Sequence, residues 1–169
     1  MLEPLKQFIC DKCGQIIEKP EDGWVEWLHR EDPLTGRRKN QGFKIVHHSA
    51  ASPISDGTRR VRCYHYDNRA DRSDNHLEYF LGDSGLPILY GMIDSGPDFV
   101  DQKYVPEVAS VREYMEFLRR LTLPYYEEAR KYWYEAKSNG FFDSGNEVWA
   151  YLPDTLQWLI KDYGTTNDE

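Results

Sequence analysis

The sequence predicts an α+β protein, in which a zinc-knuckle antiparallel β-meander at the N-terminal end is followed by a C-terminal cluster of three to four helices. Period-two segments rich in β-branched and aromatic residues dominate up to residue 66, and apolar stripes at helical spacing dominate after residue 110. We expect residues 1–105 to form a zinc-stabilised β-rich region with one helix. Residues 106–169 are expected to pack on it as a helical region of the same compact domain.

The N-terminal region is organised around Cys10 and Cys13, which stand in a C-x-x-C spacing directly before Gly14. Two thiolates at this spacing can hold one tetrahedral cation if the chain turns tightly between them, and glycine permits the positive φ of such a turn. Alternatively, the two residues form a redox pair or a disulfide, or are simply free thiols. A redox pair normally opens a helix, which the residues after Gly14 do not resemble, and a reducing compartment disfavours a disulfide.

The remaining ligands must come from Cys63 and the histidines. In an expected strand over residues 43–48, His47 shares the apolar face with Phe43 and Ile45, and in an expected strand over residues 59–66, Cys63 lies on the apolar face. The simplest ligand set is therefore Cys10, Cys13, His47 and Cys63, with His48 and His65 as substitutes for His47. Four protein ligands leave no open coordination position, so the expected cofactor is one structural zinc ion.

The other elements follow from periodicity and end signals. A strand over residues 24–30 is expected to pair with residues 43–48 as a long-looped hairpin, residues 67–75 read as a loop, and residues 76–81 fit a helix or a strand equally well. Asp83 or Ser84 caps the first expected helix, and a capping box at Ser110 opens the second. A third helix is expected from residue 124 to residue 139, and Asp154 is expected to cap the last one.

Composition limits the classes of function. The mean hydropathy of −0.76 and the lack of a long apolar stretch argue against a membrane protein, and no secretory signal is seen, so a cytoplasmic location is expected. The net charge of −8 argues against general nucleic-acid binding, which rests on Lys and Arg. The sequence also holds 12 Tyr and 5 Trp, more than one helical face can bury, so some are expected to meet a protein partner.

One family resemblance bears on function. Part of the sequence resembles the HNH nucleases, in which a knuckle presents a histidine pair as general base and metal ligand beside a later Asn and His. The matching residues are Cys10, Cys13, His47, His48, Asn68 or Asn75, and His76. The resemblance implies metal-dependent hydrolysis of a phosphodiester, in which a base stands next to a metal-bound phosphate. The sequence lacks the second C-x-x-C and the basic balance that this activity would need.

Two hypotheses therefore result from the sequence. The favoured one is a small, acidic, non-enzymatic zinc-binding protein that acts through protein–protein interaction, with the partner and oligomeric state open. The alternative is an HNH-like metal-dependent nuclease. Other enzyme classes have less support, because no phosphate-binding or nucleophile motif occurs and Asp22, Glu26 and Glu78 form no pair with a distinctive spacing.

Overall fold

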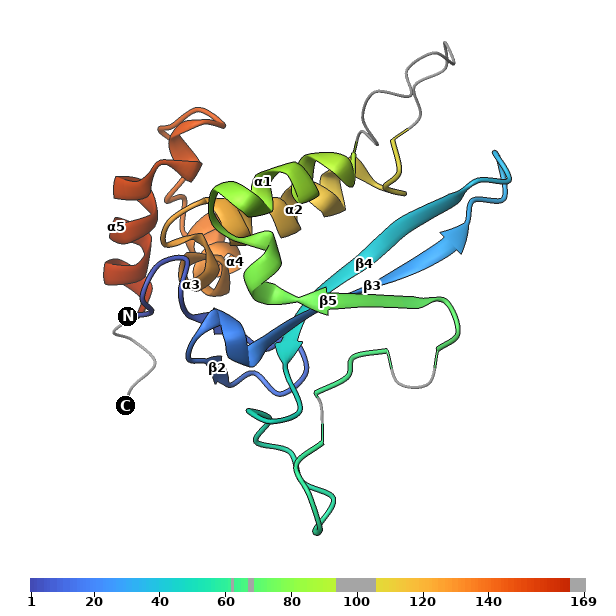
Figure 1. The fold of residues 1–169 in the computed structure, drawn as a ribbon. Coiled ribbons are helices and arrows are strands. Elements are labelled where there is room, and N and C mark those ends of the chain that lie inside the picture. The colour runs from blue at the N-terminus through green and yellow to red at the C-terminus, as the bar shows by residue number, and fades with distance from the viewer. Residues whose placement is uncertain (62, 67–68, 94–105, 165–169) are drawn as a thin grey trace.

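The fold is α+β, with antiparallel strands in the N-terminal half and helices concentrated in the C-terminal half (Figure 1). It was obtained as a computed structural model, which describes residues 1–61, 63–66, 69–93 and 106–164. The strands are β1 (Phe8–Ile9), β2 (Ile16–Ile17), β3 (Gly23–Glu31), β4 (Arg38–His47) and β5 (Arg72–His76). The α-helices are α1 (Gly82–Gly91), α2 (Val111–Thr122), α3 (Tyr126–Ala129), α4 (Trp133–Ser138) and α5 (Pro153–Gly164). Short 3-10 helices are η1 (Pro20–Asp22), η2 (Leu77–Phe80), η3 (Arg130–Tyr132) and η4 (Trp149–Tyr151).

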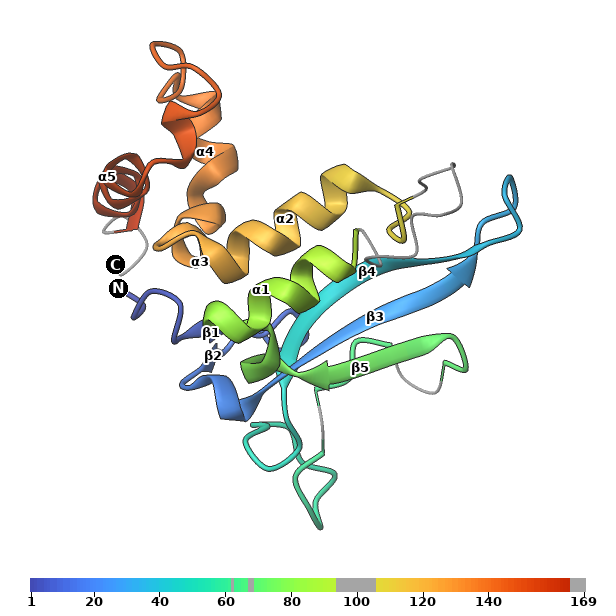
Figure 2. The ribbon, with the colours of Figure 1, turned by 45° about the horizontal axis from the view of Figure 1, so that its top comes forward.

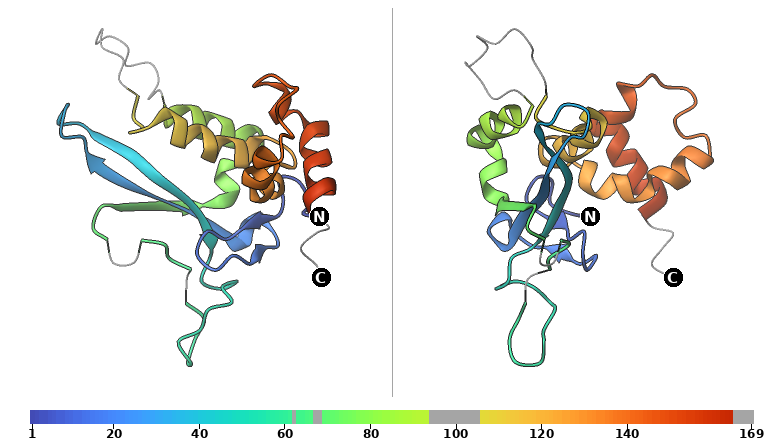
Figure 3. Two further views of the ribbon diagram at one scale, coloured as in Figure 1. Left: turned by 180° about the vertical axis from the view of Figure 1, so that it is seen from behind. Right: turned by 90° about the vertical axis from the view of Figure 1, so that its right-hand side faces the viewer.

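The central sheet is antiparallel with the order β4-β3-β5, and β1 and β2 form a separate small hairpin. The expected hairpin of β3 and β4 is confirmed, and both strands run further than predicted, from Gly23↔His47 to Glu31↔Arg38. Its far end projects away from the helices, and residues 49–61 project from the other end of the sheet (Figure 3). The end of β4, which is His47, lies next to β1 and β2 (Figure 1). We call this end of the sheet its base.

The third strand is not where the sequence predicts it. The expected strand at residues 59–66 is wrong, since its described residues make only the isolated bridge between Ser55 and Arg60. The strand that pairs with β3 is instead β5, within the stretch expected to be a loop. Its sequence, RSDNH, has no apolar alternation, and its side chains are only half-buried. Backbone pairing with a buried central strand stabilises this polar segment, and composition alone carries no signal for that.

Helices α1 and α2 lie side by side over the sheet (Figures 1 and 2). The hydroxyl of Tyr114 in α2 donates to the carbonyl oxygen of Leu89 in α1, and Phe117 stacks on Phe43 of β4 with 4.8 Å between ring centroids. The capping box is confirmed in part: the Ser110 hydroxyl accepts from the backbone N–H of Glu113. The Glu113 carboxylate completes a different contact, because it accepts from the backbone N–H of Gly42.

Three other helix predictions need correction. Helix α1 begins at Gly82 without a side-chain cap, so Asp83 and Ser84 lie inside it, and α5 begins at Pro153 rather than after Asp154. The single helix expected over residues 124–139 is broken into α3, η3 and α4. Tyr125 has a left-handed φ of 69°, so α3 begins at Tyr126, after the predicted start at Pro124. Residues 76–81, left undecided by the sequence, end β5 and form η2.

Two hydrophobic clusters fill the interior. One lies between the sheet and α1 and α2, and the other lies among α3, α4 and α5. Helix α2 contributes Tyr114, Phe117 and Leu121 to the first cluster. The division into regions 1–105 and 106–169 stays a prediction. Its boundary directly follows residues 94–105, which lie outside the described part of the chain. Among the described residues, no helix has both the length and the apolar character to cross a bilayer.

Two glycines of α1 provide a matched test of this packing. A Cβ at Gly85 would overlap the backbone of Phe80 in η2, whereas a Cβ at Gly91 would meet no atom within 4 Å. We expect Gly85→Ala to destabilise the protein by about 2 kcal/mol through overpacking. Gly91→Ala should be neutral or stabilising by up to about 1 kcal/mol, because alanine favours the helix. Denaturant unfolding of both variants checks this, and equal effects would contradict the close approach of η2 and α1.

Candidate metal centre

The hairpin of β1 and β2 forms the turn that carries two cysteines. Phe8 pairs with Ile17 and Ile9 with Ile16, so the residues between them must reverse direction. Within this turn the backbone N–H of Cys10 donates to the Gln15 carbonyl oxygen at 2.9 Å, and that of Gly14 donates to the Cys10 carbonyl oxygen at 2.9 Å. Gly14 has a φ of +74°, which glycine adopts without strain. The knuckle expected from the C-x-x-C spacing is therefore formed.

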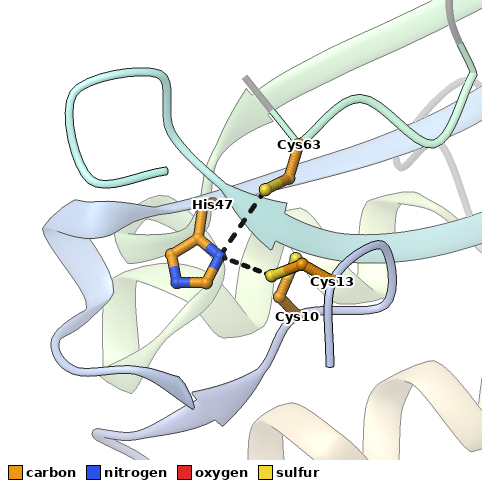
Figure 4. Close-up of side chains that lie close together, drawn as sticks. All are labelled: Cys10, Cys13, His47 and Cys63. Atoms are coloured by element: carbon orange, nitrogen blue, oxygen red, sulfur yellow. Dashed lines mark hydrogen bonds between the residues drawn. The ribbon is translucent and has the colours of Figure 1, made fainter. Parts of the chain in front are cut away.

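The other two members come from different parts of the chain. His47 is the last residue of β4, and Cys63 lies in the irregular segment between β4 and β5. The donor atoms of Cys10, Cys13, His47 and Cys63 all lie within 4.8 Å of one another. Figure 4 shows the cysteine side chains directed toward Nδ1 of the His47 ring. The structure thus brings together the four residues that the sequence singled out.

Two distances within the group can be compared with the edges of a coordination shell. Nδ1 of His47 lies 3.5 Å from Sγ of Cys13 and 3.8 Å from Sγ of Cys63. A tetrahedral zinc ion with Zn–S of about 2.3 Å and Zn–N of about 2.0 Å would set its ligand atoms roughly 3.5–3.8 Å apart along each edge. The two distances from His47 therefore match such edges, and all four residues are placed close enough together to hold one metal ion.

The His47 ring is held in the orientation that a metal ligand needs. Its Nε2 lies 3.1 Å from the carbonyl oxygen of Ile16 in β2, and a carbonyl can only accept. That contact places the proton on Nε2, so the lone pair of Nδ1 faces the sulfur atoms. A backbone acceptor for the second ring nitrogen is the usual partner of a metal-bound histidine.

Burial disfavours the thiolate form of two of the three cysteines, Cys10 and Cys63. Cys10 and Cys63 are buried, and Cys13 is half-buried. Burial raises the pKa of Cys10, and burial with the neighbouring thiols raises the pKa of Cys63 to about 12. The buried Ser52 hydroxyl lies 3.1 Å from Sγ of Cys63 and can donate to a thiolate there. A bound cation would reverse the balance, because it stabilises the deprotonated thiols directly.

The substitutes considered for His47 lie elsewhere. The ring of His48 packs near Trp24 at 5.3 Å between centroids, and the exposed His65 contacts the ring of Tyr66 at 4.8 Å. Neither belongs to the Cys/His group of the described residues. The alternation in β4 therefore singled out the histidine that lies in this group, whereas Cys63 lies in the group without the strand that the same argument assumed.

Glu26 of β3 positions the segment that carries Cys63. Its side chain is fully buried, and Oε2 accepts the backbone N–H groups of His65 at 2.9 Å and Tyr66 at 3.3 Å. Burial raises the pKa of this carboxyl, although the two N–H donors and Arg72 oppose the shift. The Tyr66 hydroxyl in turn donates to the Gly42 carbonyl oxygen of β4 at 2.7 Å. Side-chain contacts thus replace the expected strand ladder in this segment.

Asp11, which stands between the two knuckle cysteines, connects the knuckle to the helices. Its carboxylate accepts the backbone N–H of Ile45 at 2.7 Å and Nη1 of Arg120 in α2 at 2.7 Å. Arg130 approaches the same carboxylate at 3.4 Å. Burial alone would raise the pKa of Asp11, but the charge and hydrogen bond of Arg120 outweigh it and hold the pKa below its usual value.

Glu127 of α3 completes this buried network. It takes two hydrogen bonds from Arg120, at 2.7 and 2.8 Å, and accepts the backbone N–H of Ile9 at 2.9 Å. Arg120 also donates to the Ile9 carbonyl oxygen at 3.2 Å and is only 5% exposed. The sequence analysis missed Asp11, Arg120 and Glu127. The sequence offered one signal, which is that the charged Arg120 stands at a core-facing position of an amphipathic helix. This signal does not identify the partners of Arg120.

No family model, no curated protein and no solved structure matches this chain.

The buried network gives a prediction about coupling. We expect Asp11→Ala to lower the free energy of unfolding by about 3 kcal/mol, because Arg120 would keep its buried charge but lose one of its two acidic partners. Lys6→Ala is the matched control, since the Lys6–Glu3 pair is exposed and contributes little. Chemical denaturation of both variants with metal bound is the measurement. Equal unfolding curves for Asp11→Ala and the unsubstituted protein would show that the ion pair of Asp11 with Arg120 of α2 does not stabilise the fold.

Proposed function

We propose that this chain is a non-enzymatic zinc-binding protein, in which one structural zinc ion is held by Cys10, Cys13, His47 and Cys63 and the folded surface binds a protein partner. The observation that supports it is the arrangement of the four donors, which are within 4.8 Å of one another and come from three separate segments. Four protein ligands saturate a tetrahedral ion, which is typical of structural rather than catalytic zinc. Soft thiolate donors favour zinc over magnesium or calcium.

Binding of a protein partner is supported by the surface of the helical part. Large side chains remain exposed there, including Tyr134 at 84%, Val148 at 68% and Trp158 at 53%. Aromatic and aliphatic side chains on a surface are favoured anchors of protein interfaces. A reducing compartment such as the cytoplasm would keep the three free thiols available for metal.

The adjacent pair His47 and His48 tests the proposed ligand set. We expect His47→Ala to lose most of the bound zinc and to lower Tm by at least roughly 4–8 °C, which corresponds to about 2 kcal/mol for a chain of this size. His48→Ala should keep one zinc per chain, because its ring lies against Trp24 and outside the group. Elemental analysis and thermal unfolding of both variants give the result. Zinc retained by His47→Ala and lost from His48→Ala would disprove the assignment.

A metal-dependent nuclease is the second candidate, for one reason. The rings of His48 and His76 stack 5.9 Å apart with 19° between their planes, so two residues of the HNH-like pattern lie together. Both rings also pack near Trp24, and the Asn75 side chain accepts the backbone N–H of His76. Incubation of the zinc-loaded protein with plasmid DNA and Mg²⁺ or Mn²⁺ separates the two proposals. Cleavage that His48→Ala abolishes would favour the nuclease, and its absence would leave the binding protein.

A further inference from the structure

A hollow with a volume of about 350 Å³ lies between the central sheet and the C-terminal end of α1, and we call it the sheet hollow. Four of its lining residues form two cross-strand pairs. Trp27 of β3 lies opposite Ser73 of β5, and His29 of β3 lies opposite Asn40 of β4. Because Trp27 and His29 are two residues apart on one strand, their side chains share the face of the sheet that α1 covers (Figure 2).

Glu107 contributes a negative charge to the sheet hollow. It is the one carboxylate among the described residues that line the hollow, and no lysine or arginine of that part of the chain lines it. The backbone fixes this residue, because the Glu107 carbonyl oxygen accepts the N–H of Asn40 at 2.7 Å and the next residue, Val108, forms a bridge with Asn40. Within the described ranges, the half-buried Glu107 carboxylate forms no hydrogen bond or ion pair. The protein therefore leaves this charge uncompensated, and a cationic ligand would compensate it.

The C-terminal end of α1 adds a partial negative charge. Gly91 is the last residue of this helix and Met92 is its C-cap, and both line the sheet hollow together with Ile88 of the last turn. The carbonyl groups at the end of a helix sum to a partial negative charge, which favours a cation nearby. No basic residue stands in the last turn of α1 to offset it. Both charged features of the hollow therefore have the same sign.

Two rings of the hollow are held in place before any ligand binds. The indole of Trp27 stacks on Phe43 with 6.2 Å between ring centroids and meets Phe80 edge-on at 6.1 Å. Nδ1 of His29 lies 2.9 Å from Oδ1 of Asn40, and an amide oxygen can only accept, so Nδ1 carries the proton. In its neutral form the His29 ring therefore keeps Nε2 as a hydrogen-bond acceptor. An aromatic ring and an acceptor are suitable partners for a planar cation.

We propose that the sheet hollow binds the side chain of an arginine that a partner protein presents. The guanidinium pairs with the Glu107 carboxylate, packs against the Trp27 ring and donates to Nε2 of His29. The apolar stem of the arginine lies along Ile88 and Met92. Arginine suits this lining better than lysine, because a guanidinium stacks on aromatic rings and is less strongly hydrated than an ammonium group. The assignment rests on the proposed function, since it names the chemistry by which the protein partner is recognised.

The surroundings of the hollow favour a polypeptide over a free small molecule. The hollow is open to solvent, so it can receive the end of one long side chain while the rest of the ligand stays outside. Ile88 at its wall is 36% exposed, and Tyr90, next to Gly91 on α1, is 59% exposed. Such side chains can contact the residues that flank the arginine in a partner. The net charge of −8 also attracts a basic segment over a longer range.

Peptide selection with a counter-selection tests the assignment. A displayed random peptide library is selected on the zinc-loaded full chain, and peptides that also bind Gly91→Leu are removed. A Cβ at Gly91 meets no atom within 4 Å, so a leucine has room there and would fill the hollow. We expect the remaining peptides to share an arginine. Replacing it by citrulline, which has a similar shape without the charge, should raise Kd roughly tenfold, because a charge-assisted hydrogen bond is lost. Fluorescence anisotropy of the labelled peptides gives Kd.

Variants of the protein then locate the contact. At about pH 8, where histidine is neutral, Glu107→Gln should raise the Kd of the selected peptides roughly tenfold. Glu135→Gln makes the same change at an exposed position of α4 and should leave Kd unchanged. Gly91→Ala should retain binding, because one methyl group leaves most of the hollow open. The melting temperature of each variant is measured first, and an unchanged or raised value shows that the fold is kept.

Three results would overturn the assignment: no peptide survives the counter-selection, the survivors lack arginine, or Glu107→Gln binds them as tightly as the unsubstituted chain does. N-acetylarginine amide that binds as tightly as the peptides would indicate a small-molecule ligand and would overturn the choice of a protein partner. Zinc content is measured on the same samples. One zinc per chain without arginine peptides would disprove the role of the hollow alone, whereas arginine peptides bound by a zinc-free chain would disprove the zinc site of the proposed function.

Discussion

Three thiols and one imidazole meet at the base of the sheet, in an arrangement that could hold a metal ion. Buried thiolates repel one another and lose hydration, and burial accordingly raises the pKa of Cys10 and Cys63. The group joins the β1–β2 turn, the end of β4 and Cys63 in the segment before β5. A metal ion would convert a repulsive cluster into the bond that fixes all three segments, as in small domains whose folding depends on zinc.

The buried charges carry this constraint into the helices. Asp11 lies between the knuckle cysteines, and its ion pair with Arg120 is joined by Glu127 of α3, which also binds the backbone of Ile9. Burying such charges costs free energy that only complete pairing offsets, so the network stabilises one arrangement of knuckle and helices and penalises others. Arg130 of η3 extends the network through its ion pairs with Asp11 and Glu127. The network therefore joins the knuckle to the helices.

Local patterns predicted the parts of this arrangement that have a local cause. The C-x-x-C spacing predicted the knuckle, alternation in β4 predicted His47, and the Ser110 cap predicted the start of α2. The buried ion-pair network could not be predicted from the sequence, because Asp11 and Arg120 are 109 residues apart and no sequence motif relates residues at that distance. Strand β5 was missed for a similar reason. Its polar side chains show no alternation, and it is stabilised by backbone pairing with β3, which is distant in the sequence. Cys63 lies in the predicted group, but the strand on which that prediction rested is not formed, and hydrogen bonds to Glu26 hold the following residues instead.

The most direct test of the central claim is the metal content of the purified, full-length protein, measured by elemental analysis together with a count of reactive thiols. We expect one zinc per chain, with all three cysteines unreactive toward a thiol reagent until a chelator removes the metal. Loss of helical circular dichroism should accompany chelation, because the knuckle and the helices share the Asp11 network. A metal-free protein that is fully folded, with three thiols reacting without chelation, would contradict the claim that a metal ion organises this fold.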